Sequence, residues 1–143
     1  MFKHNPLSFH KAAMPAANAA ECAREQGKFW EMQDMLFANN KKLTDPDLES
    51  YANKLGLNEK VWKDCFTANK YKSRIKADQK TAVSLGAGGT PAFFINGRFL
   101  SGARPFDQFK EVIDAELKKA KASGVSKRDY YQKEIVAKGQ KKP

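Results

Sequence analysis

The chain has 143 residues, of which 41% are hydrophobic and 29% are charged, enough for one globular domain with a core of its own. No apolar run approaches the roughly 20 residues that a bilayer span needs, and no charged segment followed by an apolar one marks a signal peptide at the N-terminus. The net charge is +10, but there is no recognition helix, zinc knuckle or aromatic stacking face, so specific nucleic-acid binding is not expected.

The first part of the chain is predicted to be a short strand followed by helices. Residues 2–7 alternate in polarity and predict a strand that Pro6 ends. An alanine-rich helical region, Phe9–Asn39, follows, with Pro15 in its first turn and Gly27 dividing it. Beyond Gly27, apolar side chains form one broad helical face, made up of Phe29, Trp30, Met32, Leu36 and Phe37.

Three further helices are predicted between residues 44 and 85. Thr44 starts the first with a capping box that Asp47 completes, and Gly56 ends it. Asn58 caps a second, short helix. The third, Tyr71–Leu85, places four apolar side chains inward, namely Tyr71, Ile75, Ala82 and Leu85.

The segment Gly86–Phe99 carries the strongest local signal in the chain. A glycine-rich loop leads through Thr90 and Pro91 into an apolar run, and Asn96-Gly97 separates this run from a second one. Asn-Gly favours a type I′ turn, in which both central residues need positive φ, so the two runs are predicted to pair as a hairpin. Proline at the start of a strand indicates a special turn, and the bond before Pro91 is predicted to be cis.

Two helices are predicted after the hairpin. Pro105 opens one whose apolar side chains share one face, namely Phe106, Phe109, Ile113 and Leu117. Ser126 and Asp129 form a last capping box before a helix with Tyr130, Tyr131 and Ile135. Residues 138–143 are expected to be frayed, and basic residues are concentrated between Lys118 and Lys142.

The two cysteines, Cys22 and Cys65, lie far apart in two predicted helices. The favoured interpretation is that both are small buried thiols, although the sequence leaves a disulfide open. Only His4 and His10 could add metal ligands, at unsuitable spacing, so neither a metal site nor a cofactor is expected. Both histidines are interpreted as structural, because the sequence shows no nucleophile or carboxylate beside them.

Three stretches are distinctive in combination: residues 2–10 leading into the alanine-rich helix, Gln26–Met32, and Gly89–Gly97. Together they resemble a DsbA-like thioredoxin-fold protein of the bacterial thiol–disulfide oxidoreductase group, over about residues 2–120. The resemblance implies an α+β, predominantly helical fold: an incomplete thioredoxin-like domain with a helical insertion. We expect a single domain over residues 1–143, with the insertion at about 11–85 and the hairpin and C-terminal helices at 86–137.

The resemblance also implies what is absent from this chain. The family's opening strand, its Cys-x-x-C motif and the helix behind it would precede Phe2, so the chain looks like a truncated or non-catalytic version. Disulfide exchange needs a thiolate of lowered pKa at a helix N-terminus and a second cysteine to resolve the mixed disulfide. We therefore expect no catalytic residue and no redox activity, while the resemblance assigns substrate binding to Thr90 and Pro91.

Two other functions stay open: a non-catalytic peptide-binding or oligomerisation module and, more weakly, a binder of polyanions. The resemblance suggests a periplasmic or exported parent protein. In the family's sheet, the missing strand would lie between Phe2–Asn5 and Ala92–Ile95. Because unpaired backbone groups are costly to bury, Phe2–Asn5 should re-pair with Ala92–Ile95, or a second chain should cover the exposed edge. The expected partners are therefore a polypeptide substrate or further copies of the chain, in a homo-oligomer.

Overall fold

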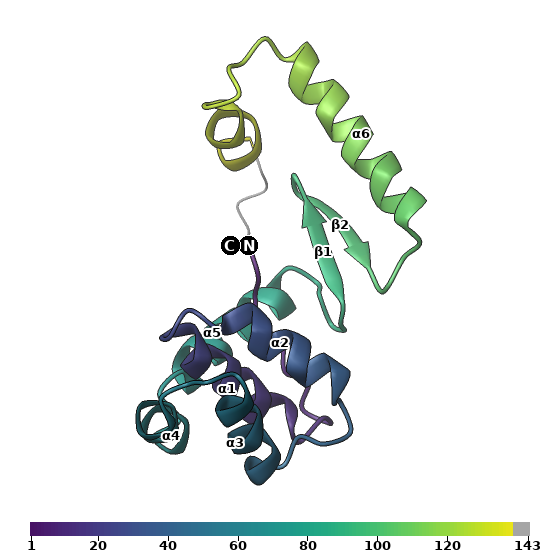
Figure 1. Ribbon diagram of the computed structural model, residues 1–143. Coiled ribbons are helices and arrows are strands. Elements are labelled where there is room, and N and C mark those ends of the chain that lie inside the picture. Colours follow the sequence, from purple (N-terminus) through teal and green to yellow (C-terminus); the bar gives the residue numbers. More distant parts are fainter. Residues whose placement is uncertain (139–143) are drawn as a thin grey trace. The chain divides into compact units, whose positions relative to one another are not determined.

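The computed structural model describes residues 1–138 and shows helices with one small hairpin (Figure 1). The chain forms two compact units, Met1–Gly86 and a second unit that starts at Ala87. Residues 139–143 lie outside the described residues. They include most of the predicted frayed end, 138–143, together with Lys141 and Lys142.

Five helices build the first unit: α1 (Ala13–Arg24), α2 (Phe29–Ala38), α3 (Asp45–Lys54), α4 (Glu59–Thr67) and α5 (Lys72–Ser84). Gly27 and Gly56 follow α1 and α3 with φ of +73° and +68°, values that a residue with a Cβ rarely adopts. The Thr44 N–H donates to Asp47 at 3.0 Å before α3, and the Val61 N–H donates to Asn58 at 3.0 Å in α4. The predicted ends at Gly27 and Gly56 and the predicted caps at Thr44 and Asn58 are therefore confirmed, whereas the first helix begins at Ala13 and not at Phe9.

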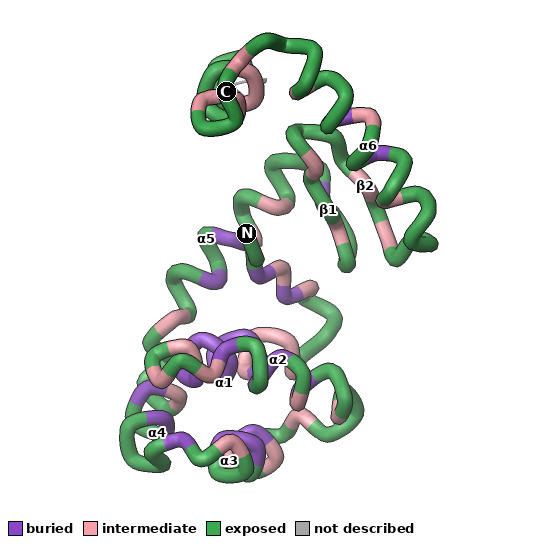
Figure 2. Tube along the Cα trace, turned by 45° about the horizontal axis from the view of Figure 1, so that its top comes forward, coloured by how far each residue is buried: buried purple, intermediate pink, exposed green. Residues whose placement is uncertain are grey.

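The core of the first unit lies where α1 packs against the other four helices. Alanine permits this close approach, and Ala19, Ala20 and Ala23 are fully buried. Trp62 stacks on Phe66 with ring centroids 4.8 Å apart, and its Nε1 donates to the Ala19 carbonyl at 3.1 Å. Figure 2 shows buried residues along α1, and the helices that pack on it also contribute buried positions.

Residues 2–7 do not form the predicted strand, and within residues 1–138 the sheet holds only β1 and β2. Side chains of α5 form hydrogen bonds with backbone groups of this segment instead. The His4 N–H donates to the Asp78 carboxylate at 3.3 Å, and the Gln79 amide donates to the Pro6 carbonyl. The expected pairing of Phe2–Asn5 with Ala92–Ile95 is therefore not present. Alternation alone could not reveal that helix side chains would replace a partner strand.

The inner face of α5 differs in part from its prediction. Ile75 is fully buried as expected, whereas Leu85 is 43% exposed. The buried position one turn after Ile75 is Asp78, whose carboxylate binds the N-terminal segment. The buried face of α5 thus includes a polar side chain, which is tolerated there because it has a hydrogen-bond partner. A search for apolar periodicity could not identify this position.

The second unit consists of β1 (Ala92–Ile95), β2 (Arg98–Ser101), α6 (Phe106–Ala122) and a π-helical segment, η1 (Tyr131–Val136). The strands pair antiparallel, with Ile95 opposite Arg98, so the predicted hairpin is confirmed. The helix α6 lies on the hairpin face that carries Phe93, whose ring meets Phe109 edge-on at 4.8 Å.

The apolar face predicted for α6 is largely open to solvent. Phe106 is 78% exposed, and Ile113 and Leu117 are each about half exposed. The helix buries Val112 and Glu116 instead. No helix in the described part of the chain has both the length and the apolar character to cross a membrane.

Candidate functional site

The predicted substrate-binding pair, Thr90 and Pro91, lies on the surface of the second unit. Both residues are exposed, and the peptide bond between them is cis. The Pro91 carbonyl accepts a hydrogen bond from the Gly102 N–H at 2.8 Å, which ties the loop to the end of β2. The loop is therefore anchored on the hairpin side while Thr90 stays accessible.

The register of the hairpin fixes which backbone groups face outward. In an antiparallel pair, opposed residues alternate between exchanging two hydrogen bonds and pointing their N–H and C=O away from each other. The pair flanking a two-residue turn is bonded, here Ile95 with Arg98, and the Gly102–Pro91 bond follows the same alternation. Ala92 and Phe94 consequently direct their backbone groups to the outer edge of β1.

The two edges of the hairpin differ. Within the described residues β1 pairs only with β2, so its outer edge is open at Ala92 and Phe94. On β2 the outward positions are Phe99 and Ser101, but the Ser101 carbonyl already accepts a hydrogen bond from Arg104 Nε at 2.7 Å. The sequence did not single out Arg104, because nothing in its pattern indicates a bond back to the strand.

An aromatic pair marks the hairpin face opposite α6. Phe94 and Phe99 are partners in the register, with ring centroids 5.0 Å apart, and each is 43% exposed. This face therefore joins an apolar surface to the open edge of β1, a combination that suits an extended polypeptide.

The cysteines are joined in a disulfide between α1 and α4, so the interpretation as two free thiols is wrong. The prediction that both are buried is correct, since Cys22 is 1% and Cys65 6% exposed. The packing of α4 on α1 brings their Cα atoms within 5.8 Å, a long-range contact that the spacing in the sequence does not show. Neither sulfur is a thiolate in this structure.

The polar groups near the disulfide are engaged with one another. Glu25 accepts hydrogen bonds from Lys70 and the Tyr71 hydroxyl, each at 2.7 Å, and both bonds lower the pKa of Glu25. The bond to Glu25, together with burial, raises the pKa of Tyr71 to about 12. Glu25 stays charged and Tyr71 neutral near pH 7, so neither is poised to activate a thiol.

A separate polar cluster surrounds the buried side chains of His4 and Glu21. His4 Nε2 lies 2.8 Å from Glu21 Oε1, and Arg24 and Arg74 approach Glu21 Oε2 at 2.8 and 3.2 Å. Burial acts to raise the pKa of Glu21, but the hydrogen bonds from Arg24 and His4 outweigh it and hold that pKa below its usual value. Glu21 is therefore the carboxylate partner of His4, which the sequence did not reveal. The contact is consistent with a structural role for this histidine.

His10 lies exposed beside Phe9, outside this cluster. Within residues 1–138 the structure groups no three side chains of His, Cys, Asp or Glu that could hold a metal ion.

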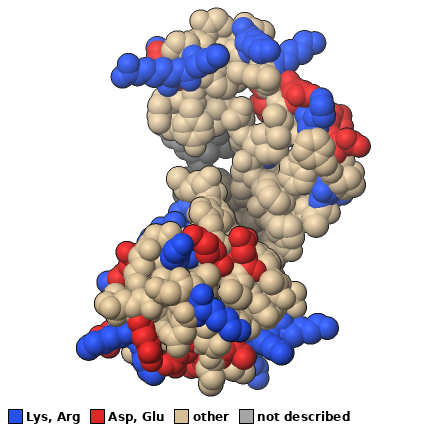
Figure 3. All heavy atoms as spheres, viewed as in Figure 1, with Lys and Arg blue, Asp and Glu red and all other residues tan. Residues whose placement is uncertain are grey.

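Basic side chains gather toward the end of the second unit that holds η1 (Figure 3). Several are already paired: Lys119 with Glu116, Lys133 with Asp129, and Lys138 with Glu134. Polyanion binding by this surface stays a prediction.

Comparison with known proteins identifies the fold. The family model of the DSBA-like thioredoxin domain matches residues 2–114. An Na(+)/H(+) antiporter NhaA 3 of Salinispora tropica is 40% identical over 99 residues, 68% of this chain and 15% of the antiporter. Antiporters NhaA 1 of Salinispora arenicola and NhaA of Nitrosospira multiformis are 39% and 35% identical, covering 79% and 75% of this chain. The chain spans less than a fifth of the length of these curated relatives.

Proposed function

Because this chain belongs to the family of DsbA-like thioredoxin domains, which are related to thiol–disulfide oxidoreductases, we propose that it binds an extended polypeptide without exchanging disulfides itself. The segment shared with the antiporters is a small part of each of them, so the family's polypeptide chemistry is the better guide to this chain. The observation that carries the proposal is the open edge of β1, which continues from the exposed Thr90–Pro91 loop.

Binding is proposed to occur by strand addition. An incoming strand would form hydrogen bonds with the outward backbone groups of Ala92 and Phe94 and reach Thr90 at its end. The neighbouring rings of Phe94 and Phe99 would cover apolar side chains of the ligand. Backbone recognition of this kind selects an extended conformation more than a particular sequence.

The absence of exchange chemistry in this chain is proposed from its cysteines. The sequence has only Cys22 and Cys65, and both are consumed in one buried disulfide that joins two helices of the first unit. Exchange requires an accessible thiolate with lowered pKa and a resolving cysteine next to it. The pair is better explained as a cross-link of the helical unit.

Amide hydrogen exchange tests the binding site. The probe is an uncharged ten-residue peptide of Thr, Val and Gln, and binding should slow exchange at the Ala92 and Phe94 amides. Phe94→Pro removes an outward N–H without removing a bond to β2, so it should abolish this protection. Phe99→Pro is the matched comparison, because Phe99 is the register partner of Phe94 with the same exposure. It removes one of the two rings and should weaken binding, but it should leave the exchange protection at Ala92 and Phe94 detectable. Equal loss in both variants would contradict the proposal.

Insulin reduction by dithiothreitol tests the redox part separately. The chain should not accelerate the reaction above a control without protein. Turnover that disappears in Cys22→Ser would show that the disulfide is catalytic and that its assignment as a cross-link is wrong.

Self-association is a second candidate, favoured by the open β1 edge and the exposed apolar face of α6. Sedimentation equilibrium should then show association at tens of micromolar, weakened by Phe94→Pro and not by Phe99→Pro. A monomer at these concentrations would exclude a stable homo-oligomer.

A further inference from the structure

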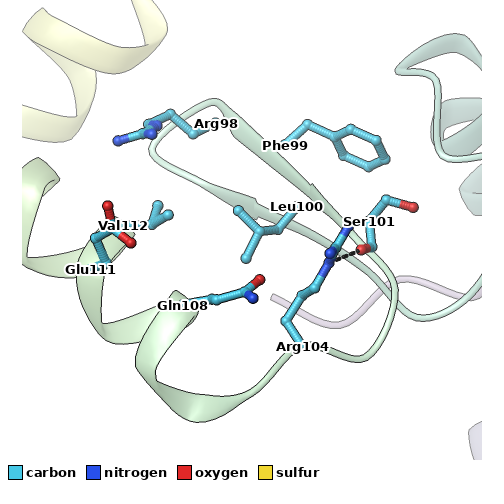
Figure 4. Close-up of a pocket in the computed structure, with 8 residues that line it drawn as sticks. All are labelled: Arg98, Phe99, Leu100, Ser101, Arg104, Gln108, Glu111 and Val112. Atoms are coloured by element: carbon cyan, nitrogen blue, oxygen red, sulfur yellow. Dashed lines mark hydrogen bonds between the residues drawn. The ribbon is translucent and has the colours of Figure 1, made fainter.

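A groove runs along β2 on the side opposite β1. It has a volume of about 490 Å³ and lies between this strand and the first half of α6 (Figure 4). Leu100 and Val112 form an apolar floor, while Arg98 and Arg104 stand at its two ends. Phe99 points its ring away from the groove, to the other face of the hairpin.

The two arginines are not equally available. Arg98 lies 3.6 Å from the Glu116 carboxylate, which it shares with Lys119 at 2.7 Å. Arg104 uses only Nε, for the Ser101 carbonyl, and its two Nη atoms have no partner among the described residues. A guanidinium held by one nitrogen presents its remaining donors in a fixed direction, which favours a two-point contact with a carboxylate.

Gln108 supplies a second polar group at the same end. Its side-chain amide has no hydrogen-bond partner in the described part of the chain, and Figure 4 shows it pointing into the groove on the side where Arg104 lies. Glu111 also lines the groove and carries the opposite charge. The groove thus combines an uncommitted cation, an amide and an apolar floor with one acidic side chain that would repel an acidic ligand.

The edge of β2 adds backbone recognition to this groove. Phe99 is the remaining outward position on β2 with free N–H and C=O, because Arg104 occupies the Ser101 carbonyl. One open position suits a short extended stretch rather than a long added strand. Its side chains would alternate between the groove floor and solvent.

We propose that this groove binds a short extended polypeptide stretch through an acidic side chain, which Arg104 and Gln108 hold at one end of the apolar floor. The site lies on the opposite edge of the hairpin from the Thr90–Pro91 loop, so it goes beyond the function proposed above. An aliphatic side chain two residues from the acidic one would rest on Leu100 and Val112. The chemical class of the ligand is therefore an extended peptide with one Asp or Glu beside aliphatic residues.

Two peptides test the proposal on the full chain. The first is the uncharged Thr, Val and Gln peptide used above, and the second carries Glu at one central Gln position. Fluorescence anisotropy should give about tenfold tighter binding for the Glu peptide, as expected for one added charge-assisted contact. The Glu peptide should also slow exchange at the Phe99 amide and shift the side-chain amide resonances of Gln108.

Variants identify the residues responsible. Arg104→Gln should remove the preference for Glu, and Glu111→Gln should strengthen binding by removing like-charge repulsion. Arg128→Gln is the matched control, because it makes the same change of charge at an exposed position outside the groove. Phe99→Pro should reduce the preference for the Glu peptide over the uncharged peptide, whereas Phe94→Pro should leave that preference in place.

Three results would overturn the proposal: equal affinity for both peptides, equal losses in Arg104→Gln and Arg128→Gln, or exchange protection limited to Ala92 and Phe94. The last of these would leave binding at β1 intact, so the two sites can fail independently. Circular dichroism on each variant tests whether the helices persist. Gln108→Ala leaves Arg104 and its bond to Ser101 in place, so a loss of affinity in this variant supports the site without altering the hairpin.

Discussion

The two units of this chain bury their apolar side chains to very different extents. In the first unit, Trp62, Met32 and Leu48 are at most 1% exposed, and a disulfide joins two of the helices. In the described part of the second unit, the buried hydrophobic residues are Ala87 and Val112, while large side chains such as Phe106 stay in solvent. Buried apolar packing is therefore concentrated in residues 1–86, although Phe9, Trp30 and Phe37 are exposed in that unit too.

The largest expected difference between the units comes from the disulfide. It closes a loop of 43 residues, and loop-closure entropy predicts that the double variant Cys22→Ser, Cys65→Ser loses about 4 kcal/mol of unfolding free energy. Both tryptophans, Trp30 and Trp62, belong to the first unit, so urea unfolding followed by tryptophan fluorescence reports on this unit. Amide exchange in α6 should stay unchanged. Equal destabilisation of α6 would show that the units unfold together.

A matched pair of leucines compares the two units directly. Leu48 is fully buried, so Leu48→Ala should cost about 3 kcal/mol through lost burial and an unfilled cavity. Leu117 is 48% exposed, and Leu117→Ala should change stability by no more than about 0.5 kcal/mol. Denaturant unfolding measures the first and α6 amide exchange the second. A large cost for Leu117→Ala would mean that the open face of α6 is covered in solution.

The polar cluster of the first unit gives it an acid-sensitive contribution. The lowered pKa of Glu21 adds stability above its unfolded pKa, near 4.5, and this stability is lost as pH falls through the lower folded pKa. Glu21→Gln should cost about 2–3 kcal/mol at pH 7, because Arg24 and Arg74 lose their buried counter-charge. The variant should also show a flatter decline of stability below pH 4.5. Parallel pH profiles for both proteins would contradict the assignment.

The smallest effect concerns the start of α3. The Thr44 hydroxyl and backbone N–H both bind Asp47, so Thr44→Ala should cost about 1 kcal/mol, the usual value for a helix cap. Thr81→Ala is the control, because Thr81 lies inside α5 and its hydroxyl bonds only to the carbonyl of Ala77. It should change the unfolding midpoint little. Equal midpoints for both variants would mean that the cap contributes nothing.

Features encoded within a few residues could be predicted from the sequence. Positive φ is needed at Gly27, at Gly56 and in the Asn96-Gly97 turn, and few residue types adopt it. The helix ends and the hairpin register could therefore be predicted from these residues and their immediate neighbours. The family model supports the fold that the resemblance implied, while substrate binding by Thr90 and Pro91 stays a prediction.

Features set by contacts between distant residues could not be predicted. The Cys22–Cys65 disulfide depends on how α4 packs on α1, and the fate of residues 2–7 depends on Asp78, more than 70 positions away. The groove beside β2 depends on the direction in which Arg104 turns after the strand. Periodicity describes which face of an element is apolar, but it does not say which element will meet that face.

The bond between Arg104 and Ser101 has a consequence for how copies of this chain could assemble. A hairpin that pairs through both edges can add copies without limit and form a filament, whereas pairing through one edge ends with two copies around a two-fold axis. Because Arg104 already binds the Ser101 carbonyl, consecutive ladder bonds between β2 and a second strand are hindered at this position. This single side-chain bond would therefore keep any association through the hairpin finite and symmetric, and its loss would open a route to fibres.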